Sequence, residues 1–256
     1  MRDEQPLKPA NILNIVAINQ GKKPLTMSTP IARPLSVVET EKLIAEEGHV
    51  VVDCRSSASF GSGHIPGSFN VQLSGSEFEQ RIGWVVSDSS PIILVADSAD
   101  DAQKAIFKMA FIGLDQQVVG YLSGGIKGWM AGGKQLRTVG QMDVHTLNHR
   151  LMSNSLQVLD VRKEDEWSEG HIDGSHFMPY TSMADQPTQA SQLATLSIPH
   201  PKDIAVVCAG GQRSSTAISL LLRDGYLSLY NVTGGMVAWK DAKLPMVNAD
   251  GIACNI

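Results

Sequence analysis

Cysteine is scarce in this chain, whose 256 residues include Cys54, Cys208 and Cys254 and contain no CxxC pair. An odd number of widely separated cysteines argues against a disulfide framework and against a structural zinc site. The seven histidines form no HxH or HExxH motif, so no metal and no cofactor is predicted. Each cysteine is therefore either a small buried hydrophobe or a reactive thiolate, and its sequence neighbours decide which.

Basic clusters and long apolar runs are also missing. The formal charge is −5 and no run of Lys and Arg exceeds two residues, so nucleic-acid and anionic-membrane partners, which need a basic patch, are not expected. No apolar run approaches the roughly 20 residues of a membrane span, and residues 1–10 show no apolar stretch behind a basic start. We therefore expect a cytoplasmic protein.

What the chain does contain is an internal repeat. Residues 50–71 read VVVDCRSSASFGSGHIPGSFNV and residues 157–179 read QVLDVRKEDEWSEGHIDGSHFMP, with matching positions a constant 107 residues apart. Residues 122–129 recur as 232–239, now 110 residues apart. Matches at both ends of a unit predict a tandem duplication.

Each copy alternates short apolar runs with amphipathic stretches. Strands are expected at 49–53, 91–96, 116–120, 156–161, 203–208 and 229–232. Helices are expected at 36–46, 99–111, 125–131, 143–152, 214–223 and 235–240. This alternation predicts an α/β fold, a small parallel sheet flanked by helices on both faces in each copy, with ligands at the carboxyl ends of the strands. We expect an N-terminal extension over 1–33, a first domain over 34–137 and a second over 138–256.

Cys208 ends an apolar strand and opens the stretch CAGGQRSS in front of a helix. A thiol there faces the free amides of the first helical turn and the positive end of the helix dipole. Gly210 and Gly211 allow the backbone to curl into an anion-binding nest, and Arg213 adds a fixed positive charge. Each feature favours a thiolate or persulfide anion, so Cys208 is predicted to be the nucleophile of a two-step exchange. The remaining site residues are Ala209, Gly210, Gly211, Gln212, Arg213 and Ser214.

The first copy lacks this loop. Aligning the two copies puts Ala96 opposite Cys208 and Asp101 opposite Arg213, and further aspartates nearby would repel an anionic donor. Cys54 lies inside VVDCR, with no glycine loop behind it, and is expected to be buried packing. The first copy is therefore predicted to be non-catalytic, either a packing partner that shapes one wall of the active cleft or a docking surface.

The motifs DVRKEDEW, EGHIDGS, CAGGQRSS and VTGGMVAW, in this order, resemble the landmarks of the tandem rhodanese family over roughly residues 34–246. The resemblance implies a sulfurtransferase in which Cys208 forms the persulfide and residues 209–214 cradle the sulfur. It also implies thiosulfate or a low-molecular-weight persulfide as donor, and a thiol, sulfite or cyanide as acceptor.

The first alternative is a phosphatase or arsenate reductase, since those enzymes also combine cysteine, a glycine loop and arginine at a helix start. Their loop generally holds five residues between Cys and Arg, whereas four separate Cys208 from Arg213, and Val207 rather than His precedes the cysteine. A smaller ring suits a single sulfur atom better than a phosphoryl group.

The second alternative is a sulfur-relay module whose partner is another protein. Residues 9–21 resemble the seam that follows a persulfide dioxygenase domain in some fused sulfur enzymes, so a persulfide dioxygenase partner is a further hypothesis. The sequence leaves the donor, the acceptor and the oligomeric state open.

The Asp-x-Arg and Gly-His-Ile motifs occur in both copies. Because the copy without the reactive cysteine shares them, Asp160, Arg162 and His171 are expected to be structural rather than catalytic. Trp129 and Trp239 are expected to anchor the two cores.

Overall fold

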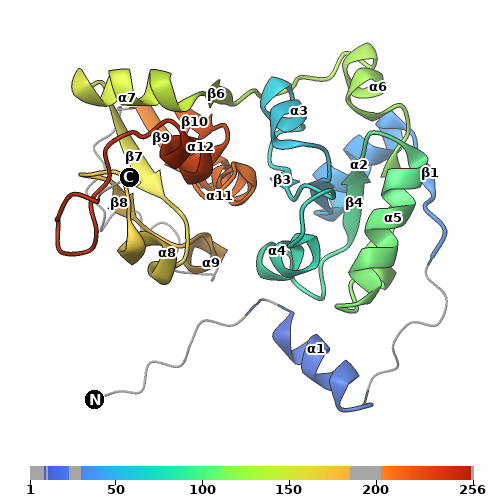
Figure 1. Cartoon of the computed structure of the whole chain (residues 1–256). Coiled ribbons are helices and arrows are strands. Elements are labelled where there is room, and N and C mark those ends of the chain that lie inside the picture. The colour runs from blue at the N-terminus through green and yellow to red at the C-terminus, as the bar shows by residue number, and fades with distance from the viewer. Residues whose placement is uncertain (1–8, 10, 23–29, 185–202, 255–256) are drawn as a thin grey trace. The chain divides into compact units, whose positions relative to one another are not determined.

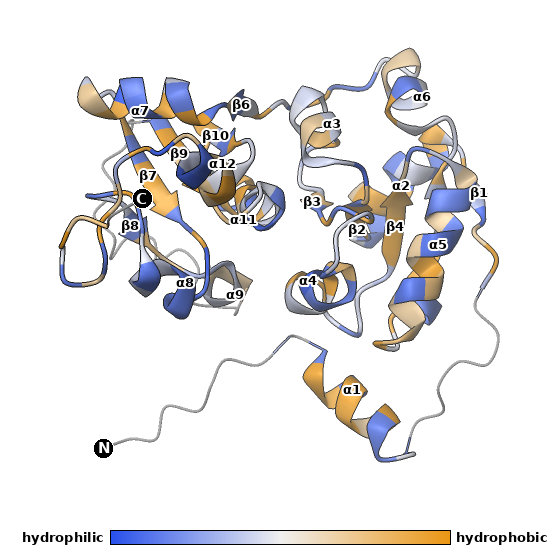
Figure 2. Cartoon of the chain, viewed as in Figure 1, coloured by the Kyte–Doolittle hydropathy of each residue, from blue (hydrophilic) through white to orange (hydrophobic). Residues whose placement is uncertain are grey.

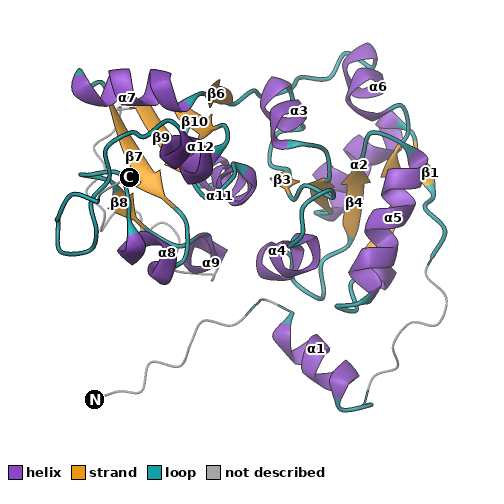
Figure 3. Ribbon diagram, in the orientation of Figure 1, coloured by secondary structure: helices purple, strands orange, loops and turns teal. Residues whose placement is uncertain are grey.

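The computed structural model describes residues 9, 11–22, 30–184 and 203–254. The chain forms two compact units, Met1–Thr138 and Val139–Ile256 (Figure 1). Each unit contains a five-stranded sheet in which every strand pair is parallel. Helices flank both sheets (Figure 3). The predicted fold class, two α/β domains with small parallel sheets, is confirmed.

In the first unit the strand order is β1-β5-β4-β2-β3. The strands are β1 Pro34–Leu35, β2 Val50–Asp53, β3 Phe69–Asn70, β4 Ile92–Val95 and β5 Val118–Leu122. The helices are α2 Val37–Glu47, α3 Ser57–Ser62, α4 Phe78–Val85, α5 Ala99–Ala110, the 3-10 turn η1 Asp115–Gln117 and α6 Gly125–Ala131. All four residues of β4 are buried, which explains its unbroken apolar sequence (Figure 2).

The second unit repeats the plan with the strand order β6-β10-β9-β7-β8. Its strands are β6 Gly140–Met142, β7 Leu156–Asp160, β8 His176–Phe177, β9 Asp203–Val207 and β10 Leu229–Val232. Its helices are α7 Val144–Met152, α8 Glu164–Glu169, α9 Tyr180–Ala184, α11 Gln212–Arg223 and α12 Gly235–Asp241. The core anchors are confirmed: Trp239 is 1% exposed and Trp129, in the first unit, is 6% exposed.

The sequence-based assignment is incomplete at short elements and at one helix start. Strands β1, β3, β6 and β8 have two or three residues each, and α3 and α8 have six, too few for a periodic pattern. Helix α11 begins at Gln212 rather than Ser214, because Gly211 takes a left-handed φ of 91° and caps the helix. Gln212, Arg213 and Ser214 therefore belong to the first helical turn, and the loop proper is three residues long.

The duplicated Asp-x-Arg motifs make the same contacts in both units. The Arg162 guanidinium donates to both carboxylate oxygens of Asp160 and to a glycine carbonyl of the Gly-His-Ile turn. Arg55 does the same with Asp53. Both pairs are almost wholly buried. The motif ties the end of a central strand to the following turn, so its predicted structural role is confirmed.

The duplicated histidines are also satisfied within their turns. His171 Nδ1 lies 3.0 Å from the Trp167 carbonyl oxygen and its ring stacks on that indole, with centroids 3.7 Å apart. His64 makes the same two contacts with Phe60, at 3.0 Å and 3.9 Å. These contacts account for the position of both imidazole rings without a role as general base.

The described part of the N-terminal extension belongs to the first unit. Helix α1 (Ile12–Asn19) is anchored by the amides of Asn11 and Asn14, which donate to the Ile112 carbonyl oxygen at 3.2 and 3.1 Å. No helix in the described ranges is both long and apolar enough to cross a membrane.

Candidate active site

Cys208 lies at the carboxyl end of β9, in the middle of the second sheet. Asp160 of β7 pairs with Val207, and Cys208 follows at once. Its side chain is 1% exposed. The Sγ atom accepts a hydrogen bond from the Gly211 N–H at 3.1 Å and lies 3.4 Å from the Ser214 hydroxyl. The structure thus joins the strand end, the glycine turn and the helix start that the sequence predicted.

The rest of the predicted loop is less enclosed than the sulfur. Ala209 and Gln212 are half-buried, and Gly210 is exposed. A Cβ atom added to Gly210 would meet no atom of the described residues within 4 Å. Gly210 is therefore the open side of the loop within that part of the chain, while Gly211 is held against the sulfur.

The first turn of helix α12 is hydrogen-bonded to the loop backbone and clamps it in place. The backbone N–H groups of Met236 and Val237 donate to the carbonyl oxygens of Cys208 at 2.8 Å and Ala209 at 3.0 Å. Gly235 permits this approach, because a Cβ there would lie 2.2 Å from the Cys208 carbonyl oxygen. Sequence reasoning did not assign Gly235 to the site, although its repeated Gly-Gly motif was a usable signal.

Arg213 is engaged by a carboxylate. Its guanidinium donates through two nitrogens to the two oxygens of Glu166 of α8, at 2.6 and 2.8 Å. This hydrogen-bonded pairing holds the pKa of Glu166 below its usual value. The fixed positive charge predicted at Arg213 is thus paired with a carboxylate, and the group that donates to the Cys208 sulfur is the Gly211 N–H in front of α11. Sequence reasoning missed Glu166, although the first copy has Ser59 there.

The corresponding place in the first unit is built differently. Asp53 pairs with Val95 as Asp160 pairs with Val207, so the structure places Ala96 opposite Cys208, as the alignment predicted. Helix α5 begins three residues after Ala96, whereas α11 begins four after Cys208. When the two helix starts are superposed, Asp100 rather than Asp101 lies opposite Arg213. A carboxylate therefore replaces the cation in either alignment.

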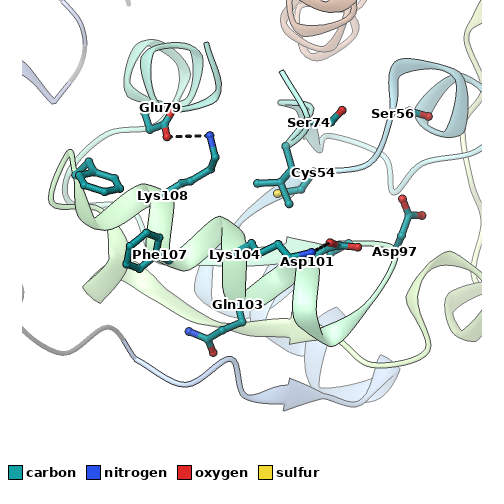
Figure 4. Close-up of a pocket in the computed structure, with 13 residues that line it drawn as sticks. Cys54, Ser56, Ser74, Glu79, Asp97, Asp101, Gln103, Lys104, Phe107 and Lys108 are labelled. Atoms are coloured by element: carbon teal, nitrogen blue, oxygen red, sulfur yellow. Dashed lines mark hydrogen bonds and ion pairs between the residues drawn. The ribbon is translucent and has the colours of Figure 1, made fainter. Parts of the chain in front are cut away.

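A pocket of about 820 Å³ opens at this place in the first unit (Figure 4). Its lining includes Cys54, Ala96, Asp97 and Asp101. Burial raises the pKa of the Cys54 thiol well above its usual range, and the carboxylates of Asp53 and Asp101 raise it further. Cys54 is therefore a neutral thiol beside carboxylates, surroundings that suit neither a nucleophile nor an anionic sulfur donor.

No three His, Cys, Asp or Glu side chains lie close enough together to hold a metal ion in the ranges that the structure describes. Cys254 is half-buried, and its Sγ lies 3.8 Å from the Glu169 carbonyl oxygen.

Fold and site together define a class: a two-domain α/β protein in which one domain carries a cysteine between a central strand and a helix N-terminus. A family model described as the rhodanese-like domain matches residues 36–132 and 143–242. The chain belongs to this family, which supports sulfur transfer in general.

Similar proteins match parts of the chain. The tRNA uridine(34) hydroxylase of Chlamydia felis (strain Fe/C-56) is 32% identical over 95 residues, 37% of this chain and 29% of that protein. The protein of the same name from Chlamydia pneumoniae is 28% identical over 106 residues, 41% of this chain and 32% of that protein. The chain thus spans about three tenths of the length of the curated relatives it matches.

The chain also resembles solved structures. The rhodanese-like domain of an Anabaena protein is 30% identical, covering 42% of this chain and 78% of that chain, with a TM-score of 0.37. Thiosulfate sulfurtransferase from Pseudomonas aeruginosa is 21% identical, covering 88% of this chain and 45% of that chain, with a TM-score of 0.38.

Proposed function

We propose that this protein is a sulfurtransferase in which Cys208 takes a sulfane sulfur from thiosulfate or a low-molecular-weight persulfide and passes it to a thiol, sulfite or cyanide. One observation carries the proposal. The Cys208 Sγ atom accepts the Gly211 N–H at 3.1 Å in front of the first turn of α11, a position that stabilises an anion on sulfur. The repeat supports it, because the copy without this loop has Ala96 in place of the cysteine.

The reaction has two half-steps. The Cys208 thiolate attacks the outer sulfur of the donor, the bond between the two donor sulfurs breaks, and its electron pair leaves with sulfite or a thiolate. The acceptor then attacks the terminal sulfur of the persulfide, and Cys208 leaves as a thiolate. Each half-step exchanges one bond to sulfur for another, so no external oxidant or reductant is required.

The Arg213–Glu166 pair bears on the choice of donor. A guanidinium already neutralised by a carboxylate at 2.6 Å attracts a dianion such as thiosulfate less than a free one would. This pairing favours a donor whose reacting end carries at most one negative charge, as in a low-molecular-weight persulfide, over the doubly charged thiosulfate. Glutathione persulfide is the probe of that class.

The proposal is tested by intact mass after incubation with thiosulfate or glutathione persulfide. The protein should gain the mass of one sulfur atom and lose it when cyanide is added. Cys208→Ser should gain nothing while keeping its fold, and Cys54→Ser, the matched control in the first unit, should gain sulfur like the parent protein. A labile sulfur that persists in Cys208→Ser would refute the assignment.

The same preparation tests the other activities. Hydrolysis of an aryl phosphate without thiosulfate cyanolysis would favour the phosphatase alternative. Hydroxylation of tRNA is the activity named for the chlamydial relatives, and nucleoside analysis after incubation with tRNA tests it directly. A relay role, or partnership with a persulfide dioxygenase, would show as faster sulfur loss from Cys208 to a protein thiol, or as turnover between glutathione persulfide, sulfite and thiosulfate.

A further inference from the structure

A chain of hydrogen bonds leads from Cys208 across the second sheet. The Cys208 Sγ and Ser214 Oγ atoms are 3.4 Å apart. The Ser214 hydroxyl donates to Asn231 Oδ1 at 2.6 Å, and Asn231 Nδ2 donates to Gln141 Oε1 at 3.2 Å. Cys208, Ser214 and Asn231 are at most 1% exposed, and Gln141 is exposed. The chain therefore connects the buried sulfur with the protein surface.

The direction of these bonds matters. A serine hydroxyl has one proton, and here it is taken by Asn231 Oδ1 at the shortest distance in the chain. In the structure Gln141 presents its amide oxygen to Asn231 Nδ2, and the Asn231 oxygen faces Ser214. Ser214 thus presents a lone pair to the sulfur, and a lone pair is satisfied by an S–H group but not by a thiolate.

We propose that Asn231 is a positioning residue for Cys208: by taking the Ser214 proton it makes the Ser214 oxygen an acceptor for the Cys208 S–H group and holds the resting cysteine as a thiol. When the thiolate or persulfide forms, the S–H proton passes to solvent and the hydroxyl turns from Asn231 to the sulfur. Cys208 then has two donors, the Ser214 hydroxyl and the Gly211 N–H. The Ser214 hydroxyl can donate its one proton either to Asn231 or to the sulfur. Its orientation is therefore the switch between the resting thiol and the reactive sulfur.

The repeat supplies an internal comparison. Asn231 pairs with Gln141 across β10 and β6, and the matching pair in the first sheet is Tyr121 with Pro34. The residue aligned with Ser214 is Ala102 in the sequence, or Asp101 when the two helix starts are superposed. In the copy that has no reactive cysteine, none of the three partners Ser214, Asn231 and Gln141 is therefore kept.

The charged groups near this chain are themselves paired. From α8, Glu166 accepts two bonds from Arg213 of α11. From β7, Asp160 is bound by Arg162. The neighbouring helix α9 contributes the buried Tyr180. The β10 sequence Leu-Tyr-Asn-Val has no carboxylate or basic side chain, and the half of α12 that binds the loop backbone, from Gly235 to Val237, has none either. Changing Asn231 therefore alters the hydrogen-bond direction without exposing an unpaired charge.

The test is the pH dependence of Cys208 alkylation by iodoacetamide, followed by the mass of the peptide that contains Cys208. Asn231→Leu frees the Ser214 proton for the sulfur, so the midpoint should move about half a pH unit or more to lower pH. The alkylation rate at pH 7 should rise about fivefold, the effect of one hydrogen bond. The same change should have little effect when Ser214 is absent. The double variant Ser214→Ala/Asn231→Leu should therefore have nearly the midpoint of Ser214→Ala alone.

Gln141→Ala is a second route that leaves the buried residues intact. It releases the Asn231 amide and should move the midpoint in the same direction by a smaller amount. Gln141→Glu keeps an acceptor oxygen and should restore the wild-type midpoint at about 0.5 M salt, which screens the added charge. An unchanged or higher midpoint in both Asn231→Leu and Gln141→Ala, or an equal shift with and without Ser214, would overturn the proposal.

The proposal rests on the proposed function in one respect, that Cys208 is the reactive thiol. The two fail separately. If the alkylation midpoints shift as expected but the protein never gains sulfur, the sulfurtransferase proposal is refuted and the switch stands. If sulfur is transferred but the midpoints of the variants do not shift, the switch is refuted and the sulfurtransferase proposal stands.

Discussion

Gly235 offers a direct test of how tightly the cysteine loop is held. Its φ is +53°, and an added Cβ would lie 2.2 Å from the Cys208 carbonyl oxygen and 2.6 Å from that of Ala209. The counterpart Gly125 has a φ of +55°, but there the nearest atom would be the Ala96 carbonyl oxygen at 3.6 Å, an ordinary contact. The two alanine substitutions share the left-handed backbone strain and differ in the clash with the loop.

The magnitude follows from these contacts. A left-handed alanine costs about 1 kcal/mol in either unit. Gly235→Ala must in addition separate α12 from the loop, which breaks the bonds from Met236 N–H to Cys208 at 2.8 Å and from Val237 N–H to Ala209 at 3.0 Å. At about 1 kcal/mol each, the total is about 3 kcal/mol, against about 1 kcal/mol for Gly125→Ala. Because the loop moves with its sulfur, the rate of sulfur transfer should fall about tenfold to a hundredfold.

Hydrogen exchange followed by mass spectrometry reports the two units separately, which a single fluorescence transition would not. Gly235→Ala should lower the protection of amides against exchange in the second unit. Gly125→Ala should lower it in the first unit, and by a smaller amount. Thiosulfate cyanolysis measures the effect on the site. If Gly235→Ala kept full activity, or if the two variants lost equal stability, the clamp from α12 would not position Cys208.

Three further predictions concern titration and charge. Burial holds the pKa of His64 at about 4 in the folded protein, below its unfolded value of about 6.5, so the unfolded chain binds the proton first. The stability of the first unit should therefore fall as pH drops from about 6.5 towards 4. His64→Gln should make this fall less steep in acid unfolding curves. Burial also raises the pKa of Cys54, so peptide mapping after iodoacetamide treatment at pH 8 should find Cys208 labelled well before Cys54; the reverse order would contradict the assignment of roles. Glu166→Gln removes the carboxylate charge beside Arg213, so KM for thiosulfate should fall about threefold to tenfold, and an unchanged KM would mean that this charge pair does not govern donor binding.

Much of the scaffold follows from local sequence patterns. Apolar runs such as 92–95 are long enough to predict a buried strand, and the repeat predicts that both copies share one plan. The two-residue strands β3 and β8 could not be predicted in this way, because they form only where a neighbouring strand supplies the hydrogen bonds. The start of α11 was placed two residues late, since a left-handed Gly211 caps it without any side-chain bond.

The candidate site divides along the same line. Cys208, the glycine turn and the helix start are adjacent in the chain, so local sequence is enough to bring them together. The partners that modify their chemistry are distant in sequence: Glu166 is 47 residues from Arg213, and Gln141 is 90 residues from Asn231. No local pattern encodes such contacts, because they depend on which elements the sheet order makes neighbours.

By itself the sequence determined that the chain is a duplicated α/β protein with one cysteine loop, because hydrophobic period, glycine positions and repeats are written in neighbouring residues. It also determined that the first copy has Ala96 at the position of Cys208. The tertiary structure decided how that loop is tuned. It neutralises Arg213 with Glu166, presses Gly235 against the loop carbonyls and turns the Ser214 proton away from the sulfur. Each of these effects depends on the distance and direction between atoms of separate elements, which folding alone sets.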